Sequence, residues 1–464
     1  MTSLSRIWRP LGIVPWLLLI IWFLAPTLGV IERMQRGDPP PPDLATYLRA
    51  ANQLRQGQPL YATVAEARQI WLAINALERA NYLTDAGAAV AANIPGPYIY
   101  PPALAVWLYW LNFQPALCVG LIFLSIVSFG ALWLYATRAH TQRDGPGRTV
   151  SGWWLFLLIG SWPVLSLIPT TGNIEPVLLF VLLVTAWTLW RGYAVFSAPL
   201  IAFVVLVKPF YALFYVSFGL LLLVNPTHNL RQVWRTLNVA ALLTLLIIAV
   251  TAVMWGRALW APAWQFLSNA LEYHWLVLPP AQQTPLSIWN RTPLQALVNL
   301  GIEPATALQL ALGLWVAALL LTLWLCWGRR LALPLTFALA LVLLYWGRPI
   351  GWGFHFLEIV VLMAAWPTLR SGQRLLLLSA TLALMASHWA ALALTLQGVW
   401  LRLVTMQSAE WPWESWLVLP VAWLALVLAA RQPDHPADTA APTEQAIDPA
   451  PSDAIDWRRS HATE

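Results

Sequence analysis

The feature that most constrains this chain is a succession of long apolar runs that leaves little room for charge. Hydrophobic residues make up 59% of its 464 residues and charged residues only 10%, whereas a soluble globular protein carries about 25% charged residues. The first run, residues 11–30, has the ~20-residue length that a helix needs to cross a bilayer. The sequence therefore predicts an all-α polytopic membrane protein. It excludes a disordered protein, a nucleic-acid-binding protein and an ordinary soluble enzyme.

Further apolar segments predict about 11–13 transmembrane or half-spanning helices in all, several of them shorter than the ~20 residues of a full crossing. Broken or re-entrant helices are therefore expected, with their irregular backbone covered by protein or lining a cavity. Residues 100–137 must cross an odd number of times, yet they could hold two short helices, and the sequence leaves this open. The segments lie near residues 100–113, 115–137, 153–169, 174–190, 194–207, 209–224, 235–255, 304–327, 331–346, 354–369, 374–396 and 413–430.

Arginines in the short loops predict the orientation, because cytoplasmic loops of membrane proteins are enriched in positive charge. They place the N-terminus and residues 431–464 in the cytoplasm, and the loops 31–99 and 256–300 on the external, periplasmic side of the cell (inner) membrane. An uncleaved first helix is favoured over a cleavable signal peptide, since no clear cleavage site follows residue 30. Residues 1–430 would form the membrane domain, and the Pro-, Ala- and Asp-rich tail 431–464 is expected to be disordered. The expected cytoplasmic arginines are Arg138, Arg143, Arg148, Arg191, Arg231, Arg235, Arg329, Arg330, Arg370, Arg374 and Arg431; the opposite set is Arg257, Arg291, Arg348 and Arg402.

The first external loop is too patterned to be a simple connection. Its apolar residues recur at helical spacing over 44–56, which predicts a short amphipathic helix ended by Gly57, and residues 62–83 predict a second. Such helices would lie on the membrane surface. The chain also holds 31 tryptophans, which are typical both of membrane interfaces and of sugar-stacking sites. Cys118 and Cys326 lie inside apolar runs and are expected to be small buried hydrophobes.

Two residues in this pattern carry charge where charge is expensive. Asp43 follows a run of four prolines at the start of the first amphipathic helix, where it can be a helix N-cap, a general base at the membrane surface, or both. Lys208 is the only lysine in the chain and interrupts an apolar stretch, with Pro209 breaking the helix behind it. Its ammonium either snorkels to an interface or faces an internal phosphate or carboxylate.

Other polar residues allow two interpretations each. His355 and Glu358 share a helix face, as a satisfied buried pair or as an external polar site near Arg348. Glu175 is expected to be a first-turn acid favoured by the helix dipole, and Asn173 beside it is a candidate to hydrogen-bond a sugar. Arg291, in the second external loop, can pair with a phosphate or face water.

Several segments together resemble the membrane glycosyltransferases of family 87, which include the polyprenol-phosphate-mannose mannosyltransferases and have the GT-C fold. The resemblance runs from about residue 11 to 370, with the motifs in the family's order, although the later external loop matches only loosely and one histidine stands where the family has a pair. The matching residues are Asp43, Tyr47, Ala50, Ala51, Leu54, Gly57, Pro59 and Tyr61, then Tyr100-Pro101-Pro102, Gly172-Asn173, Lys208-Pro209, Gln282 to Ser287 followed by Arg291, and Trp352-Gly353-Phe354-His355.

The resemblance implies inverting transfer of a hexose, most often mannose, from a polyprenyl-phosphate donor to a glycolipid or cell-envelope glycan acceptor at the external face. Asp43 would be the general base; Lys208, Arg291 and Arg348 would bind the donor phosphate; and Tyr47, Tyr100, Asn173, His355 and Glu358 would contact substrate. No acidic DxD-type cluster is visible in the external segments, so neither a metal nor another cofactor is expected. The alternatives are a transporter or lipid flippase, which would distribute charge along a central pathway and show internal repeats, and a non-catalytic membrane scaffold.

Overall fold

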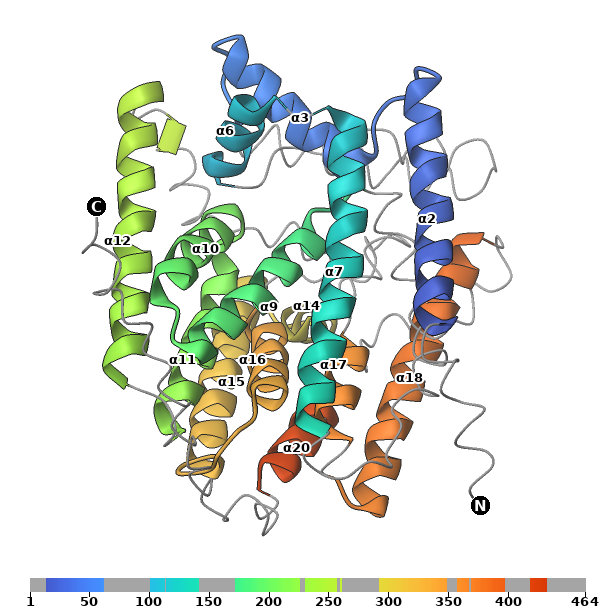
Figure 1. The fold of residues 1–464 in the computed structure, drawn as a ribbon, viewed down its shortest axis with the longest axis vertical. Helices are drawn as coiled ribbons and strands as arrows, with labels where there is room; N and C mark the ends of the chain where they lie inside the picture. Colours follow the sequence, from blue (N-terminus) through green and yellow to red (C-terminus); the bar gives the residue numbers. More distant parts are fainter. Residues whose placement is uncertain are drawn as a thin grey trace, which may run out of the picture. The chain divides into compact units, whose positions relative to one another are not determined.

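The computed structural model describes residues 14–61, 101–112, 114–141, 172–225, 230–256, 259–260, 292–348, 357–366, 369–396 and 418–431. The chain separates into two units, Met1–Arg431 and Gln432–Glu464, and all of the described residues belong to the first. The regular elements among them are all helical (Figure 1). They are α2 (Val14–Gln35), α3 (Pro42–Arg55), α6 (Pro102–Leu111), α7 (Pro115–Thr141), α9 (Glu175–Arg191), α10 (Ala194–Val207), η4 (Pro209–Tyr211), α11 (Ala212–Val224), α12 (Leu230–Trp255), α14 (Pro293–Asn299), α15 (Pro304–Leu325), α16 (Leu333–Gly347), α17 (Leu357–Ala365), α18 (Ser371–Leu396) and α20 (Leu419–Ala430).

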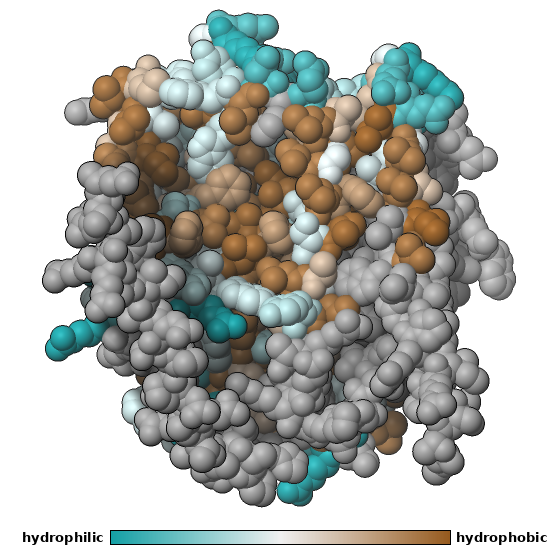
Figure 2. Space-filling model, in the orientation of Figure 1, coloured by the Kyte–Doolittle hydropathy of each residue, from teal (hydrophilic) through white to brown (hydrophobic). Residues whose placement is uncertain are grey.

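Three stretches within these helices are long and apolar enough to cross a bilayer: Pro115–Thr137, Arg231–Trp255 and Ala305–Leu325. Shorter apolar helices pack around them. Figure 2 shows apolar side chains over the middle of one face and hydrophilic side chains at its upper edge, over α3 and the end of α2. Large exposed apolar surfaces mark sites of contact with a membrane or a partner, and together with the three stretches of spanning length they make the described part of the chain that of a helical membrane protein.

Most helix boundaries follow from prolines and apolar runs. The predicted break at Lys208-Pro209 is confirmed: α10 ends at Val207, and the short 3-10 turn η4 leads into α11. The described part of the segment 100–137 holds two helices, α6 and α7, and α6 ends at Asn112, which has left-handed backbone angles. With ten residues α6 is only ~15 Å long, so of the two only α7 has spanning length. The helix α14, within the predicted second external loop, was not expected, and the segments 62–83 and 153–169 lie outside the described residues.

Helix α3 is the amphipathic helix expected at 44–56, but its beginning differs from the prediction. It starts at Pro42, its N-cap is Pro41, and no side chain caps it. The interpretation of Asp43 as the N-cap is therefore wrong: Asp43 is the second residue of the first turn. The end is as predicted, because Gly57 takes a positive φ of +65° and lets Gln58 donate back to the Gln53 carbonyl.

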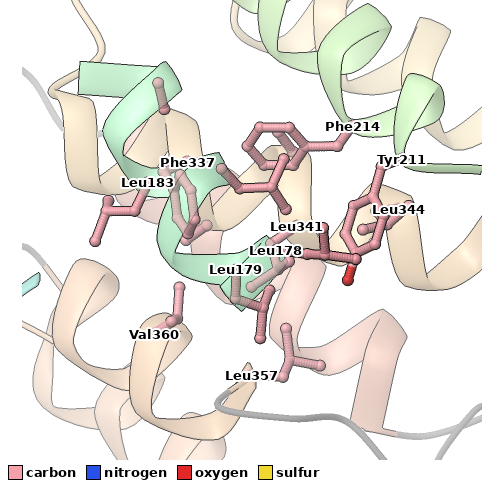
Figure 3. Close-up of a cluster of buried hydrophobic side chains, with 14 of the residues drawn as sticks. Leu178, Leu179, Leu183, Tyr211, Phe214, Phe337, Leu341, Leu344, Leu357 and Val360 are labelled. Carbon is pink, nitrogen blue, oxygen red and sulfur yellow. The ribbon is translucent and has the colours of Figure 1, made fainter. Parts of the chain in front are cut away.

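The core is built around α16, which is apolar on all sides and buried on all sides. It contacts α11, α15, α17 and α20, and almost every residue from Pro334 to Tyr345 is buried. In Figure 3, leucines of α9 lie beside Phe337 and Leu341 of α16 and beside Tyr211 of η4. These closely packed side chains hold the ends of α9, η4 and α16 in fixed positions.

The loop that precedes α9 lies directly against the first turn of α3. Gly172 in this loop has a φ of +69°, and a Cβ atom there would lie 2.7 Å from Leu44 Cβ and 3.0 Å from Pro41 Cβ. Only a glycine fits a left-handed backbone at so close an approach. The contact places Asp43, beside Leu44, next to the start of α9.

We expect Gly172→Ala to destabilise the protein more than Gly57→Ala. Both glycines have left-handed φ angles, which cost an alanine roughly 1–2 kcal/mol, but a Cβ at Gly57 meets nothing within 4 Å. Thermal unfolding in detergent micelles should show the larger drop in midpoint for Gly172→Ala. Equal losses for the two variants would mean that the loop before α9 is not closely packed on α3.

Candidate functional site

A buried carboxylate with two cationic partners lies at the start of α9. Glu175 is 1% exposed; its Oε2 accepts a hydrogen bond from Lys208 Nζ at 2.5 Å, and its Oε1 accepts one from Arg348 Nη1 at 3.2 Å. The hydroxyl of Tyr211 also donates to Oε1. A charge is stable in an apolar interior only when it is paired and hydrogen-bonded, and here all three charged groups satisfy that condition together.

The helix ends explain why these charges meet at this place. Glu175 lies in the first turn of α9, where the helix dipole favours an anion. Lys208 follows the last residue of α10, and Arg348 is the C-cap of α16, so both cations lie where the dipole favours positive charge. Each helix therefore presents its charged end to the ends of the other two.

The aromatic residue Phe210 fixes the two cations further. The Arg348 guanidinium carbon lies 4.9 Å from the centre of the Phe210 ring and 5.1 Å from that of Tyr345, and Lys208 Nζ lies 6.0 Å from the Phe210 ring. Cations attract aromatic faces at such distances. The Lys208-Pro209 break thus supplies a cation, an aromatic platform and the Tyr211 hydroxyl in four consecutive residues.

Asp43 lies next to this cluster and is bonded to it through Asn173. Asn173 Nδ2 donates to Asp43 Oδ2 at 2.9 Å, and Asn173 Oδ1 accepts from the Glu175 backbone N–H at 2.8 Å. Burial raises the pKa of the Asp43 carboxyl from its ordinary value of 3.8 to about 6; Lys208 and the Asn173 hydrogen bond lower the pKa, and Glu175 raises it. Asp43 is therefore a carboxyl group with a pKa of about 6 beside the buried cation Lys208.

The structure brings together four of the residues singled out from the sequence: Asp43, Asn173, Lys208 and Arg348. Arg348, which was predicted to lie on the external side and to bind the donor phosphate, is 3% exposed and ion-paired with Glu175. Tyr47, one turn beyond Asp43 on α3, is buried in the hydrophobic core.

The other predicted site residues are not placed. Tyr100, Arg291 and His355 lie outside the described residues. Glu358 belongs to α17, but its side chain is outside the description as well.

Two residues of the cluster, Glu175 and Tyr211, were not predicted as site residues. Glu175 does lie in the first turn of α9, as expected, but the helix dipole is only part of its environment. A lysine and an arginine at the ends of apolar segments each require a buried anion, and Glu175 is an acid that begins such a segment. This need for an anion is a signal in the sequence, but it does not identify which acid supplies the charge.

Among the described residues no group of three or more His, Cys, Asp or Glu side chains is placed to hold a metal ion. No protein-family model matches the chain, and no curated protein or solved structure matches it either. The arrangement places a carboxyl with a pKa of about 6 beside a pair of buried cations that share one carboxylate.

We expect Glu175→Gln to destabilise the protein by roughly 3–5 kcal/mol, the range found when one partner of a buried ion pair is removed. Lys208 and Arg348 would both lose the carboxylate that pairs with them. The matched control is Glu32→Gln, which removes the partner of Arg36 in a pair whose side chains are 60% and 70% exposed and should change stability by about 0–1 kcal/mol. Unfolding by SDS titration in mixed micelles measures both, and equally small effects would contradict the buried pairing.

Proposed function

We propose that this protein is a membrane glycosyltransferase of the GT-C fold, similar to family 87, that moves a hexose from a polyprenyl-phosphate donor to a lipid-linked or cell-envelope glycan acceptor. The observation that carries the proposal is that Asp43 lies beside Lys208 and is linked through Asn173 to Glu175, the partner of Lys208 and Arg348. Asp43, Gly172-Asn173 and Lys208-Pro209 are three of the motifs on which the family resemblance rests, and they are far apart in the sequence.

The proposed reaction is a single displacement at the anomeric carbon. The acceptor hydroxyl oxygen forms the new bond to this carbon while the bond to the donor phosphate oxygen breaks, so the configuration inverts and polyprenyl phosphate leaves. Asp43 accepts the hydroxyl proton, a role that suits a carboxyl with a pKa of about 6. Lys208 and Arg348 stabilise the negative charge that develops on the departing phosphate.

The charge of the buried cluster depends on Asp43. Two cations, Lys208 and Arg348, face the one carboxylate of Glu175, so the cluster with Asp43 carries one net positive charge when Asp43 is protonated and none when it is ionised. Arg191 lies at the far end of α9, ~25 Å from Glu175 at 1.5 Å per residue. Because basic loops are typical of the cytoplasmic side, the cluster belongs at the external face in this proposal.

A transporter or lipid flippase is the second candidate, because buried ion pairs between apolar helices are also typical of transport pathways. The two functions differ in whether a covalent product forms. Membranes incubated with a panel of polyprenyl-phosphate sugars should yield a glycosylated acceptor, identified by mass spectrometry. Movement of the lipid across the bilayer without any such product would favour transport.

We expect Asp43→Asn to lower the transfer rate by roughly 10²–10⁴-fold, the usual contribution of a general base. The amide keeps the size of the side chain but cannot accept the proton. The control is Asp38→Asn, which makes the same change at an exposed position in the loop between α2 and α3 and should leave the rate unchanged. Wild-type turnover by a folded, membrane-inserted Asp43→Asn enzyme would remove Asp43 from the mechanism.

The pH profile of the wild-type enzyme should rise through an apparent pKa of about 6, because only the ionised Asp43 accepts a proton. Asn173 donates to the carboxylate and so lowers its pKa. Asn173→Ala removes this donor, and the midpoint of kcat/KM should therefore move to higher pH. The control is Asn52→Ala, the same change at an exposed position of α3, the helix that carries Asp43. A midpoint that stays in place or falls in Asn173→Ala would contradict the assignment of the acidic limb to Asp43.

A further inference from the structure

A second polar feature lies at the other end of α3. It is an open depression of about 620 Å³ whose described walls are Arg55, Tyr109, Trp110 and Asn112. Asp43 and Arg55 stand near opposite ends of α3, ~18 Å apart along the helix axis. The depression is therefore separate from the cluster around Glu175.

The guanidinium of Arg55 is held in place although it is exposed. Its Nη2 donates to Asn112 Oδ1 at 2.5 Å and to the Tyr109 carbonyl at 3.3 Å, and its carbon lies 5.7 Å from the centre of the Tyr109 ring. Asn112 reaches it because the left-handed backbone of this residue ends α6. A cation fixed in this way loses little further entropy when it binds an anion.

The depression lies at the end of a helix of spanning length. Trp255 is the last residue of α12, and the candidate span Arg231–Trp255 ends with it. The rings of Tyr109 and Trp110 have their centres 5.8 Å and 6.3 Å from that of Trp255, and Trp110 is 61% exposed. Tryptophan and tyrosine at the end of a spanning helix are typical of the membrane interface, which is the level of the lipid phosphates.

Exposed apolar side chains continue along α12 away from this end. Val253, Val250 and Leu246 are all exposed and are spaced by three and four residues, so they follow one face of the helix. A lipid whose head group occupies the depression can therefore lay an acyl chain along this face.

We propose that the depression binds the phosphate of an anionic phospholipid of the surrounding bilayer. The Arg55 guanidinium makes charge-assisted hydrogen bonds to the phosphate oxygens, and Trp110 packs against the glycerol and the start of the acyl chains. The charge of Arg55 favours an anion over a neutral sugar. This inference does not depend on the proposed glycosyltransferase activity, because none of the four wall residues takes part in that reaction.

Native mass spectrometry of the full-length protein, titrated with phosphatidylglycerol, tests the site. Arg55→Gln and Trp110→Ala should each raise the Kd of the first bound phosphatidylglycerol at least fivefold. The matched control, Arg36→Gln, removes the same charge from an exposed arginine in the loop before α3 and should leave the Kd unchanged. Phosphatidylcholine, which has no net charge, should bind weakly to all of the proteins.

Three results would overturn the proposal. An unchanged Kd in Arg55→Gln would leave Arg55 as no more than a donor to the Tyr109 carbonyl and Asn112. Trp110→Ala leaves these hydrogen bonds in place, so a raised Kd in that variant shows that the effect of Arg55→Gln does not come from misfolding. Competition by inorganic phosphate at equal concentration would show a free-anion site. Displacement of phosphatidylglycerol by polyprenyl phosphate or an oligosaccharide at lower concentration would assign the depression to a substrate.

Discussion

The interaction on which the rest of this structure depends is the pairing of Glu175 with Lys208 and Arg348. Each of these charges costs several kcal/mol to remove from water, and their attraction offsets that cost only when the geometry is good. Apolar side chains of similar size would often be equally stable or better. The cluster therefore contributes little to stability that apolar side chains would not supply. A buried ion cluster is expected where a function requires charged groups in fixed positions. The cluster also joins the ends of three helices. A shift of any one helix would therefore separate opposite charges that are buried away from water.

The position of Asp43 follows from this cluster. Asn173 accepts the Glu175 backbone N–H with one side-chain atom and donates to Asp43 with the other, so the carboxyl of α3 is tied to the first turn of α9. Gly172 permits the approach, because any larger residue would push α3 away. Three of the four residues from Gly172 to Glu175 therefore hold α3 against the buried charges.

The structural features that the sequence predicted correctly are those that depend on residues next to one another in the chain. The break at Lys208-Pro209 and the end of α3 at Gly57 follow from local backbone rules. The sequence could not predict the partner of Arg348, because the hydrogen bond to Glu175 joins residues 173 positions apart. The N-cap interpretation of Asp43 failed for a related reason: a local rule assigned its oxygen to the helix N–H groups, whereas Asn173, far away in the sequence, holds it instead.

In the proposed reaction, the electrostatics of Asp43 and of the donor phosphate act on each other. Lys208 lowers the pKa of Asp43 and Glu175 raises it, so an anionic phosphate that binds at Lys208 must raise that pKa further. By thermodynamic linkage, a protonated Asp43 then strengthens phosphate binding by the same factor. Donor binding therefore favours the protonated acid, while transfer requires the ionised base. The pKa of about 6 in the empty site lies below neutral pH, and the hydrogen bond from Asn173 opposes the rise because it favours the ionised carboxylate.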